Sequence, residues 1–123
     1  MITVYLSGKM SGLAESEYRK TFKNAEEHYL SCGFNVINPC YISDIVRAEK
    51  PAATYEDFMK EDLNALARCT HIAMLENWET SEGAKREKAE AERLGLEIMY
   101  YRVIGGKKWM IKCMKDIVNF LEW

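Results

Sequence analysis

Glu87 is an acidic residue at a position that a helix would bury. The segment "SEGAKREKAEAERLG", residues 81–95, is predicted to be helical and carries many charges. Residues on a helix are spaced at about 100°, which places Ala84, Ala91 and Leu94 on one narrow apolar stripe. Glu87 falls inside that stripe and is therefore expected to face the protein interior.

Asp62 occupies the same kind of position on the preceding predicted helix. This helix spans residues 55–68, and its apolar face consists of Tyr55, Phe58, Met59, Leu63 and Leu66. Burying a carboxylate without a partner is unfavourable. Either acid alone is explained by a place at the edge of its stripe, or by a local pair with Lys60, Arg86 or Arg93. The two acids together favour a functional site.

Two carboxylates in one pocket suit glycosidic chemistry. One attacks the anomeric carbon of a sugar or stabilises an oxocarbenium ion, while the other transfers a proton. A separation of about 5 Å suits the covalent route, and about 8 Å suits direct attack by water. A nucleophilic Glu87 must be ionised at neutral pH, which the ordinary glutamate pKa of about 4.3 allows. Asp62 is expected to titrate at a higher pH if its pocket is dry.

The elements that would position these acids alternate between strands and helices. Strands are predicted at 2–6, 34–37, 71–75 and 97–103, and helices at 15–31, 55–68, 81–95 and 108–121. Residues 40–53 are predicted to be a long connection and a candidate lid or binding loop. The alternation predicts an α/β three-layer sandwich around a parallel sheet of four to five strands, in flavodoxin- or Rossmann-like order. Ligands bind such sheets at the carboxyl ends of the strands, here near Ser7-Gly8, Asn38-Pro39, Glu76–Trp78 and Arg102.

Composition and charge argue against several classes of protein. The 123 residues are 48% hydrophobic and 29% charged, which fits a single domain over 1–123 whose segment 105–123 forms a C-terminal helix. The net charge of −2 does not indicate a nucleic-acid partner. No signal-peptide pattern is present and no run approaches the roughly 20 apolar residues of a membrane span. We therefore expect a cytoplasmic protein that binds no membrane.

Neither a metal site nor a cofactor is expected from the sequence. The four cysteines are widely spaced and never form a CxxC pair, and the two histidines do not complete a metal-ligand pattern. The same spacing gives no sign of a disulfide framework. We expect reduced thiols.

Three motifs, in order along the chain, resemble a known superfamily. They are "YLSGKM" at residues 5–10, Asp62-Leu63, and "NWETSEGA" at residues 77–84, which leads to Glu87. This arrangement resembles the nucleoside 2-deoxyribosyltransferase superfamily, and most closely its small phage and bacterial branch of unknown function. The resemblance covers residues 1–101 and implies the flavodoxin-like fold predicted above.

The resemblance also implies roles for three residues. At the position of Glu87, the superfamily has the nucleophile, which forms a covalent glycosyl-enzyme intermediate. The acid that matches Asp62 orients the sugar and handles the proton of the leaving base. The tyrosine that matches Tyr5, at the end of the first strand, fixes the nucleophile.

Ser81 departs from the transferases, which usually have an aspartate there. Serine at this position is similar to the branch that hydrolyses nucleoside 5′-monophosphates, where a hydroxyl and helix-terminal N–H groups bind the phosphate. Ser81, Gly83 and Ala84 would begin a helix whose free N–H groups attract an anion. A simple N-cap explains Ser81 equally well.

Three further residues complete the predicted substrate site. Ser7 and Gly8 form the loop at the first strand end, and Trp78 follows the third strand. Trp78 is suited either to stacking a nucleobase or to packing beneath a loop.

Two classes of function are consistent with the sequence. The first is an enzyme that cleaves or transfers the N-glycosidic bond of a nucleoside or nucleoside 5′-monophosphate through Glu87. The second is a catalytically silent module that binds, senses or sequesters a nucleotide. In either case the partner is a nucleoside or nucleotide small molecule.

A homodimer or higher homo-oligomer is expected as well. The resemblance implies oligomers whose sites are completed by a neighbouring subunit. Helices rich in aromatic residues would supply the apolar area, through Tyr18, Phe22, Tyr29 and Tyr55.

Overall fold

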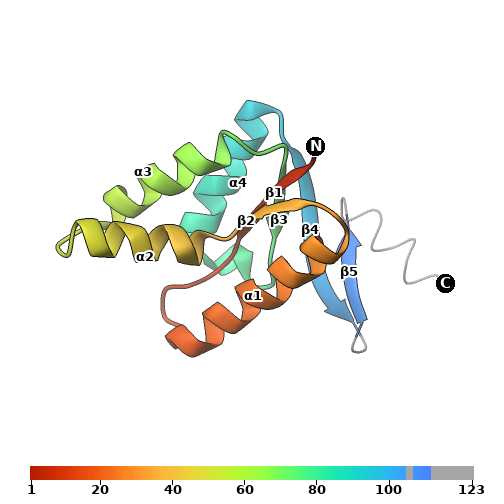
Figure 1. Ribbon diagram of the computed structural model, residues 1–123, viewed down its shortest axis with the longest axis horizontal. Coiled ribbons are helices and arrows are strands. Elements are labelled where there is room, and N and C mark those ends of the chain that lie inside the picture. The colour runs from red at the N-terminus through yellow and green to blue at the C-terminus, as the bar shows by residue number, and fades with distance from the viewer. Residues whose placement is uncertain (105–106, 112–123) are drawn as a thin grey trace.

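The described residues, 1–104 and 107–111, form an α/β fold around one five-stranded sheet in the computed structural model (Figure 1). The strand order is β2-β1-β3-β4-β5. The bounds of the strands are β1 Thr3–Ser7, β2 Asn35–Ile37, β3 His71–Met74, β4 Glu97–Ile104 and β5 Lys107–Ile111. Strands β1 to β4 pair in parallel, and β5 pairs antiparallel with β4. The predicted parallel sheet in flavodoxin-like order is therefore confirmed, with an antiparallel strand at one edge.

Helices cover both faces of this sheet and make it the middle of three layers (Figure 1). Their bounds are α1 Glu15–Ser31, α2 Pro39–Glu49, α3 Tyr55–Leu66 and α4 Glu82–Leu94, with a short 3-10 turn, η1, at Trp78–Thr80. Side chains of α1 pack with Val4 and Leu6 on one face of β1. Side chains of α3 and α4 pack with Tyr5 on the other face. Because alternate residues of a strand point to opposite faces, Tyr5 and Ser7 both point toward α4.

The predicted lid at residues 40–53 is wrong, because most of it is helix α2. The Asn38 side chain accepts a hydrogen bond from the Cys40 N–H at 3.0 Å, which caps the helix. Pro39 stands in the first turn, where its missing N–H leaves no hydrogen bond unmade. Asn38-Pro39 therefore marks the start of a helix as well as the end of a strand, whereas it was predicted only as the end of the strand.

The predicted C-terminal helix is wrong over its first residues. Residues 107–111 form strand β5, in which Met110 pairs with Tyr101 and Trp109 with Arg102. Aromatic and large apolar residues are common in strands, and a run of them is not decisive for a helix. The remainder of the predicted helix, from residue 112, lies outside the described residues, as does the Gly105-Gly106 break.

The aromatic side chains of α1 belong to the core and do not form an oligomer surface. Phe22 and Tyr29 are fully buried, and Tyr18 is nearly so. They pack against the face of the sheet opposite the two predicted catalytic acids. These three residues therefore give no support to the expected oligomer. Tyr55, the fourth aromatic residue named for it, is half exposed.

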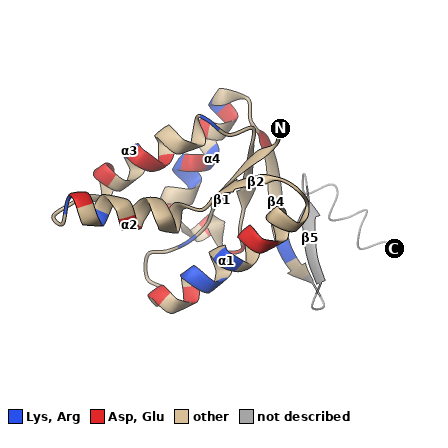
Figure 2. Cartoon of the chain, in the orientation of Figure 1, with Lys and Arg blue, Asp and Glu red and all other residues tan. Residues whose placement is uncertain are grey.

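Acidic and basic residues occur together on each of the four helices (Figure 2). Ion pairs join neighbouring helices: Arg19 of α1 binds Asp44 of α2, and Arg86 of α4 binds Glu56 of α3. Within the described part of the chain, no helix is long and apolar enough to cross a membrane.

Candidate active site

Glu87 lies on the inner face of α4 and is only 5% exposed. The Tyr5 hydroxyl donates to its Oε2 in a short hydrogen bond, and the Ser7 hydroxyl donates to its Oε1 at 2.7 Å. Both donors come from β1, which ends directly beneath α4. The acid that seemed misplaced on the helix therefore has a partner for each of its oxygens.

Burial and, to a smaller extent, the nearby charge of Asp62 raise the pKa of Glu87 to about 8, although the hydrogen bonds from Tyr5 and Ser7 act to lower it. The ordinary glutamate pKa expected from the sequence is therefore wrong, because the side chain is largely removed from water. The pKa of Tyr5 is also raised, mainly by burial and then by the charge of Glu87. Tyr5 therefore remains a hydrogen-bond donor over the whole physiological range.

Asp62 reaches the same cavity from α3. Burial raises its pKa to about 7, with a smaller contribution from the charge of Glu61. In the described part of the chain, its buried Oδ1 has no hydrogen-bond partner. Asp62 therefore differs from Glu87, because no described residue donates a hydrogen bond to this buried oxygen. The expectation that Asp62 titrates above the ordinary range agrees with this setting.

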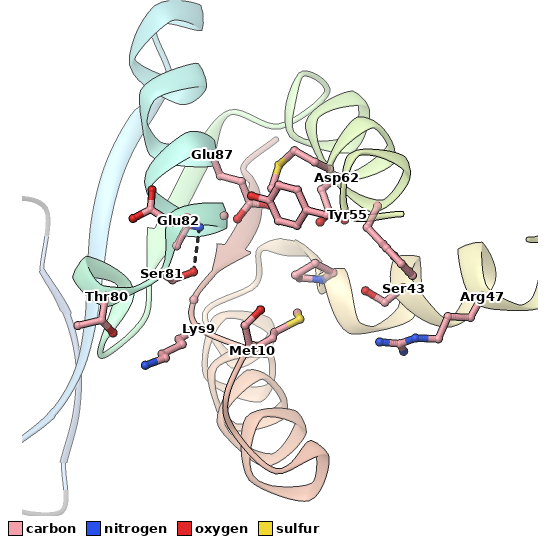
Figure 3. Close-up of a pocket in the computed structure, with 17 residues that line it drawn as sticks. Lys9, Met10, Ser43, Arg47, Tyr55, Asp62, Thr80, Ser81, Glu82 and Glu87 are labelled. Carbon is pink, nitrogen blue, oxygen red and sulfur yellow. Dashed lines mark hydrogen bonds between the residues drawn. The ribbon is translucent and has the colours of Figure 1, made fainter. Parts of the chain in front are cut away.

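The two acids share a cavity of about 390 Å³ at the carboxyl end of β1 (Figure 3). Segments from the β1–α1 loop, α2, α3 and the start of α4 surround it. The residues around it are Gly8, Lys9, Met10, Ser11, Pro39, Ser43, Arg47, Tyr55, Phe58, Met59, Asp62, Thr80, Ser81, Glu82, Gly83, Ala84 and Glu87. The volume is within the range of small-molecule sites in proteins.

The N-terminus of α4 forms one side of this cavity. The Ser81 hydroxyl accepts a hydrogen bond from the Ala84 N–H at 3.1 Å and so caps the helix (Figure 3). A hydroxyl that accepts in this way keeps its own proton for a ligand. Capping and ligand binding are therefore compatible roles for Ser81.

Two glycines allow close approaches around the site. A Cβ at Gly83 would lie 3.3 Å from Cε of Met59, so α3 and α4 approach each other closely there. A Cβ at Gly8 would lie 3.0 Å from Cβ of Leu75, where the chain leaves β1. A larger residue at Gly83 would require the end of Met59 to shift, and one at Gly8 would require Leu75 to shift.

Most, but not all, of the predicted site residues lie around the cavity. Gly8, Asp62, Glu87 and the start of α4 do. Ser7 is fully buried and contacts Glu87, so it is placed to hold the acid and not to touch a ligand directly. Trp78 is not among the lining residues; its ring packs 6.2 Å from that of Tyr100 and lies below the Lys88 ammonium. Its alternative interpretation, as a packing residue, fits this position.

Several lining residues were not predicted from the sequence. Arg47 and Ser43 were missed because α2 was taken for a loop, and their four-residue spacing on a helix is the signal that could have found them. Lys9 follows the Ser7-Gly8 turn directly. Tyr55 and Phe58 were assigned to the apolar face of α3. In the structure, the first turn of that face lines the cavity.

Arg47 and Lys9 also line the cavity, and Glu82 adds a third acidic side chain at the start of α4 (Figure 3). The Arg47 guanidinium forms an ion pair with Asp44 at 3.8 Å. Among the described residues, no group of three or more histidine, cysteine or acidic side chains is arranged to hold a metal ion.

The fold and site define an α/β protein with a buried, hydrogen-bonded carboxylate at the strand ends. Residues 2–100 match the family described as Domain of unknown function (DUF4406), and the chain belongs to this family. No curated protein and no solved structure matches the chain.

Proposed function

We propose that this protein cleaves or transfers the N-glycosidic bond of a (deoxy)nucleoside or nucleoside 5′-monophosphate, and that Glu87 is the nucleophile. The observation that carries the proposal is the setting of Glu87. A carboxylate is buried at the floor of an open cavity, with both oxygens fixed by hydroxyl donors and a second carboxyl group nearby. The resemblance to nucleoside 2-deoxyribosyltransferases supports the choice of substrate.

In the first step a Glu87 oxygen forms a bond to C1′ of the sugar as the bond from C1′ to the base nitrogen breaks. The electron pair of the broken bond goes to the base, and the carboxyl proton of Asp62 neutralises it. In the second step water attacks C1′, Asp62 takes a proton from that water, and the ester bond to Glu87 breaks. For transfer, a second base replaces the water. These steps follow the double-displacement route of retaining glycosidases.

The two acids are suited to these roles when they hold one proton between them. With the proton on Asp62, its charge no longer raises the pKa of Glu87, so that burial alone opposes the hydrogen bonds from Tyr5 and Ser7, which favour the ionised form. We assign the shared proton to Asp62, because no described residue donates a hydrogen bond to its buried Oδ1. The titration therefore belongs to the pair, not to either acid alone.

The cationic and helix-terminal groups support a phosphorylated substrate. The free N–H groups at the start of α4 and its dipole favour an anion, and Ser81, Lys9 and Arg47 line the same cavity. A 5′-phosphate bound there would place the sugar between the α4 N-terminus and Glu87.

A catalytically silent nucleotide-binding module is the second candidate. The raised pKa of Glu87 favours it, because a protonated carboxyl group is a poor nucleophile. Such a module would bind the same nucleotides without releasing the base.

Base release from a panel of nucleosides and 5′-monophosphates separates the two candidates. We expect the wild-type chain to release a free base, detected by chromatography, and Glu87→Ala to release none. Glu90→Gln is the matched control, since Glu90 is an acid on α4 that does not line the cavity. Nucleotide binding without any base release would favour the silent module, and absence of both would reject the site.

A further inference from the structure

Tyr55 is a half-exposed aromatic residue at the mouth of the cavity that contains Glu87. It is 50% exposed and lines the cavity. In Figure 3 its side chain extends from α3 toward the first turn of α4. Its hydroxyl oxygen lies 3.6 Å from the position that a Cβ at Gly83 would take. The ring therefore spans the gap between the two helices that carry the acids.

Charged residues hold the Tyr55 ring in this place. The Arg86 guanidinium lies 5.5 Å from the ring centroid, within the range of a cation–π contact. Arg86 is itself fixed, because it donates to both oxygens of Glu56 at 2.7 and 3.3 Å. The Arg86 guanidinium therefore covers one face of the ring, and Tyr55, which is 50% exposed, keeps surface for a ligand.

The Tyr55 ring lies on the same helix face as the proposed proton donor. Phe58 and Asp62 follow at spacings of three and seven residues, which places all three on one face of α3. All three line the cavity, and Met10 adds a flexible apolar side chain from the β1–α1 loop. A base that receives its proton from Asp62 must lie beside this wall.

We propose that Tyr55 is the stacking platform for the nucleobase, with Arg86 and Glu56 as its positioning residues. This inference rests on the proposed function and deepens it, because it assigns recognition of the planar base to α3 and recognition of the sugar phosphate to α4. Trp78, predicted from the sequence as the alternative platform, packs outside the cavity lining. Stacking on one ring selects for an aromatic base without choosing among bases.

The test is calorimetric titration of the full chain carrying Glu87→Gln, which prevents turnover. The ligands are the four common deoxynucleoside 5′-monophosphates and 2-deoxyribose 5-phosphate, which lacks the base. Tyr55→Leu removes the aromatic ring but keeps apolar bulk, and Tyr55→Phe keeps the ring. Tyr41→Leu is the matched control, because Tyr41 is 48% exposed on α2 and is not among the lining residues.

We expect Tyr55→Leu to weaken nucleotide binding about tenfold and to leave 2-deoxyribose 5-phosphate binding unchanged. Tyr55→Phe and Tyr41→Leu should bind nucleotides as the parent does. Equal nucleotide affinity in Tyr55→Leu and Tyr41→Leu would overturn the inference, and so would an equal loss for the ligand without a base. In both cases the proposed function stands if the wild-type chain releases base. A parent chain and a wild-type chain that bind no nucleotide would reject both.

Discussion

Glu87 and Asp62 are carboxyl groups of the same cavity in different surroundings. Glu87 has a hydroxyl donor on each oxygen, whereas Oδ1 of Asp62 has no partner among the described residues. Burial raises the pKa of both. Different surroundings of this kind allow one carboxyl group to act as a nucleophile while the other keeps a proton.

The buried Glu87 should make the protein less stable as the pH rises. Its pKa is raised from 4.5 when free to about 8 in the folded chain. Between these values the unfolded chain has lost a proton that the folded chain retains on the pair of Glu87 and Asp62, so the free energy of unfolding falls with rising pH. We expect a fall of a few kcal/mol, on the order given by about 1.4 kcal/mol per pKa unit. Thermal unfolding of wild type and Glu87→Gln at pH 5 and pH 8.5 measures it.

Glu87→Gln keeps the shape of the side chain and removes its titration. The variant should therefore show a flatter dependence of the unfolding midpoint on pH than the wild type. A wild-type midpoint that rises from pH 5 to pH 8.5, or an identical slope in the variant, would contradict the raised pKa.

Asp62→Asn tests whether Asp62 donates the proton to the leaving base, because substrates differ in how much their base needs that proton. Loss of a general acid slows a reaction by about 10²- to 10⁴-fold, and we expect this loss for ordinary nucleotides. A 7-methylguanine nucleotide carries a positive charge on its base and leaves without needing a proton, so its release should be affected far less. The measurement is the single-turnover rate of base release from each of the two substrates, in the wild type and in the variant. Equal losses for both would assign Asp62 to sugar binding only.

Helix α4 links the fold to the site at the scale of single elements. Its apolar residues Ala84 and Ala91 pack on the sheet and hold Glu87 over the end of β1, while its N-terminus opens into the cavity. Gly95, in the left-handed region with φ of 76°, ends the helix. One helix therefore carries both the proposed nucleophile and the proposed anion site.

Ser81→Asp should separate capping from anion binding. Aspartate is as good an N-cap as serine, so the unfolding midpoint should stay at the wild-type value. Its charge would repel a 5′-phosphate, so the preference for nucleotides over nucleosides should be lost in binding titrations. Ser81→Ala is the companion variant, with an expected loss of stability of about 1 kcal/mol. A variant Ser81→Asp that binds nucleotides as the wild type does would leave Ser81 as a cap alone.

The sequence predicted elements best where periodicity and caps agreed. The observed bounds of helix α1 and of the four parallel strands lie within a residue or two of the predicted ones. Apolar runs indicated the strands, and Gly33 indicated the end of the helix. Helix α2 was missed, since Asn38-Pro39 is typical of both a turn and a helix start. Strand β5 was missed because its conformation depends on a tertiary contact, the antiparallel pairing with β4, which a local sequence pattern does not reveal.

The sequence drew attention to the cavity residues that break a local pattern. Glu87 and Asp62 interrupt apolar stripes, and the structure places both around one cavity. Arg47 and Lys9 are ordinary surface cations in the sequence, and only the fold places them around the cavity. Trp78 stands at a strand end as predicted, but η1 turns it onto Tyr100.

At the scale of the whole molecule, we still expect at least a homodimer. Apolar side chains remain exposed on the outer face of α2, where Tyr41 and Ile45 are 48% and 58% exposed. Sedimentation equilibrium at micromolar concentration should give a mass well above the 14.3 kDa of one chain. A single species of that mass would contradict the expectation and leave each cavity complete in one chain.

The covalent intermediate on Glu87 is the central claim, and trapping it is the most direct test. A 2-deoxy-2-fluoro nucleotide slows breakdown of the glycosyl ester, so the adduct should accumulate. Intact-protein mass spectrometry should then show one added glycosyl group, and peptide mapping should place it on Glu87. The same incubation with Glu87→Gln should give no adduct. Base release by the wild-type chain without any adduct, or an adduct on another residue, would contradict the account.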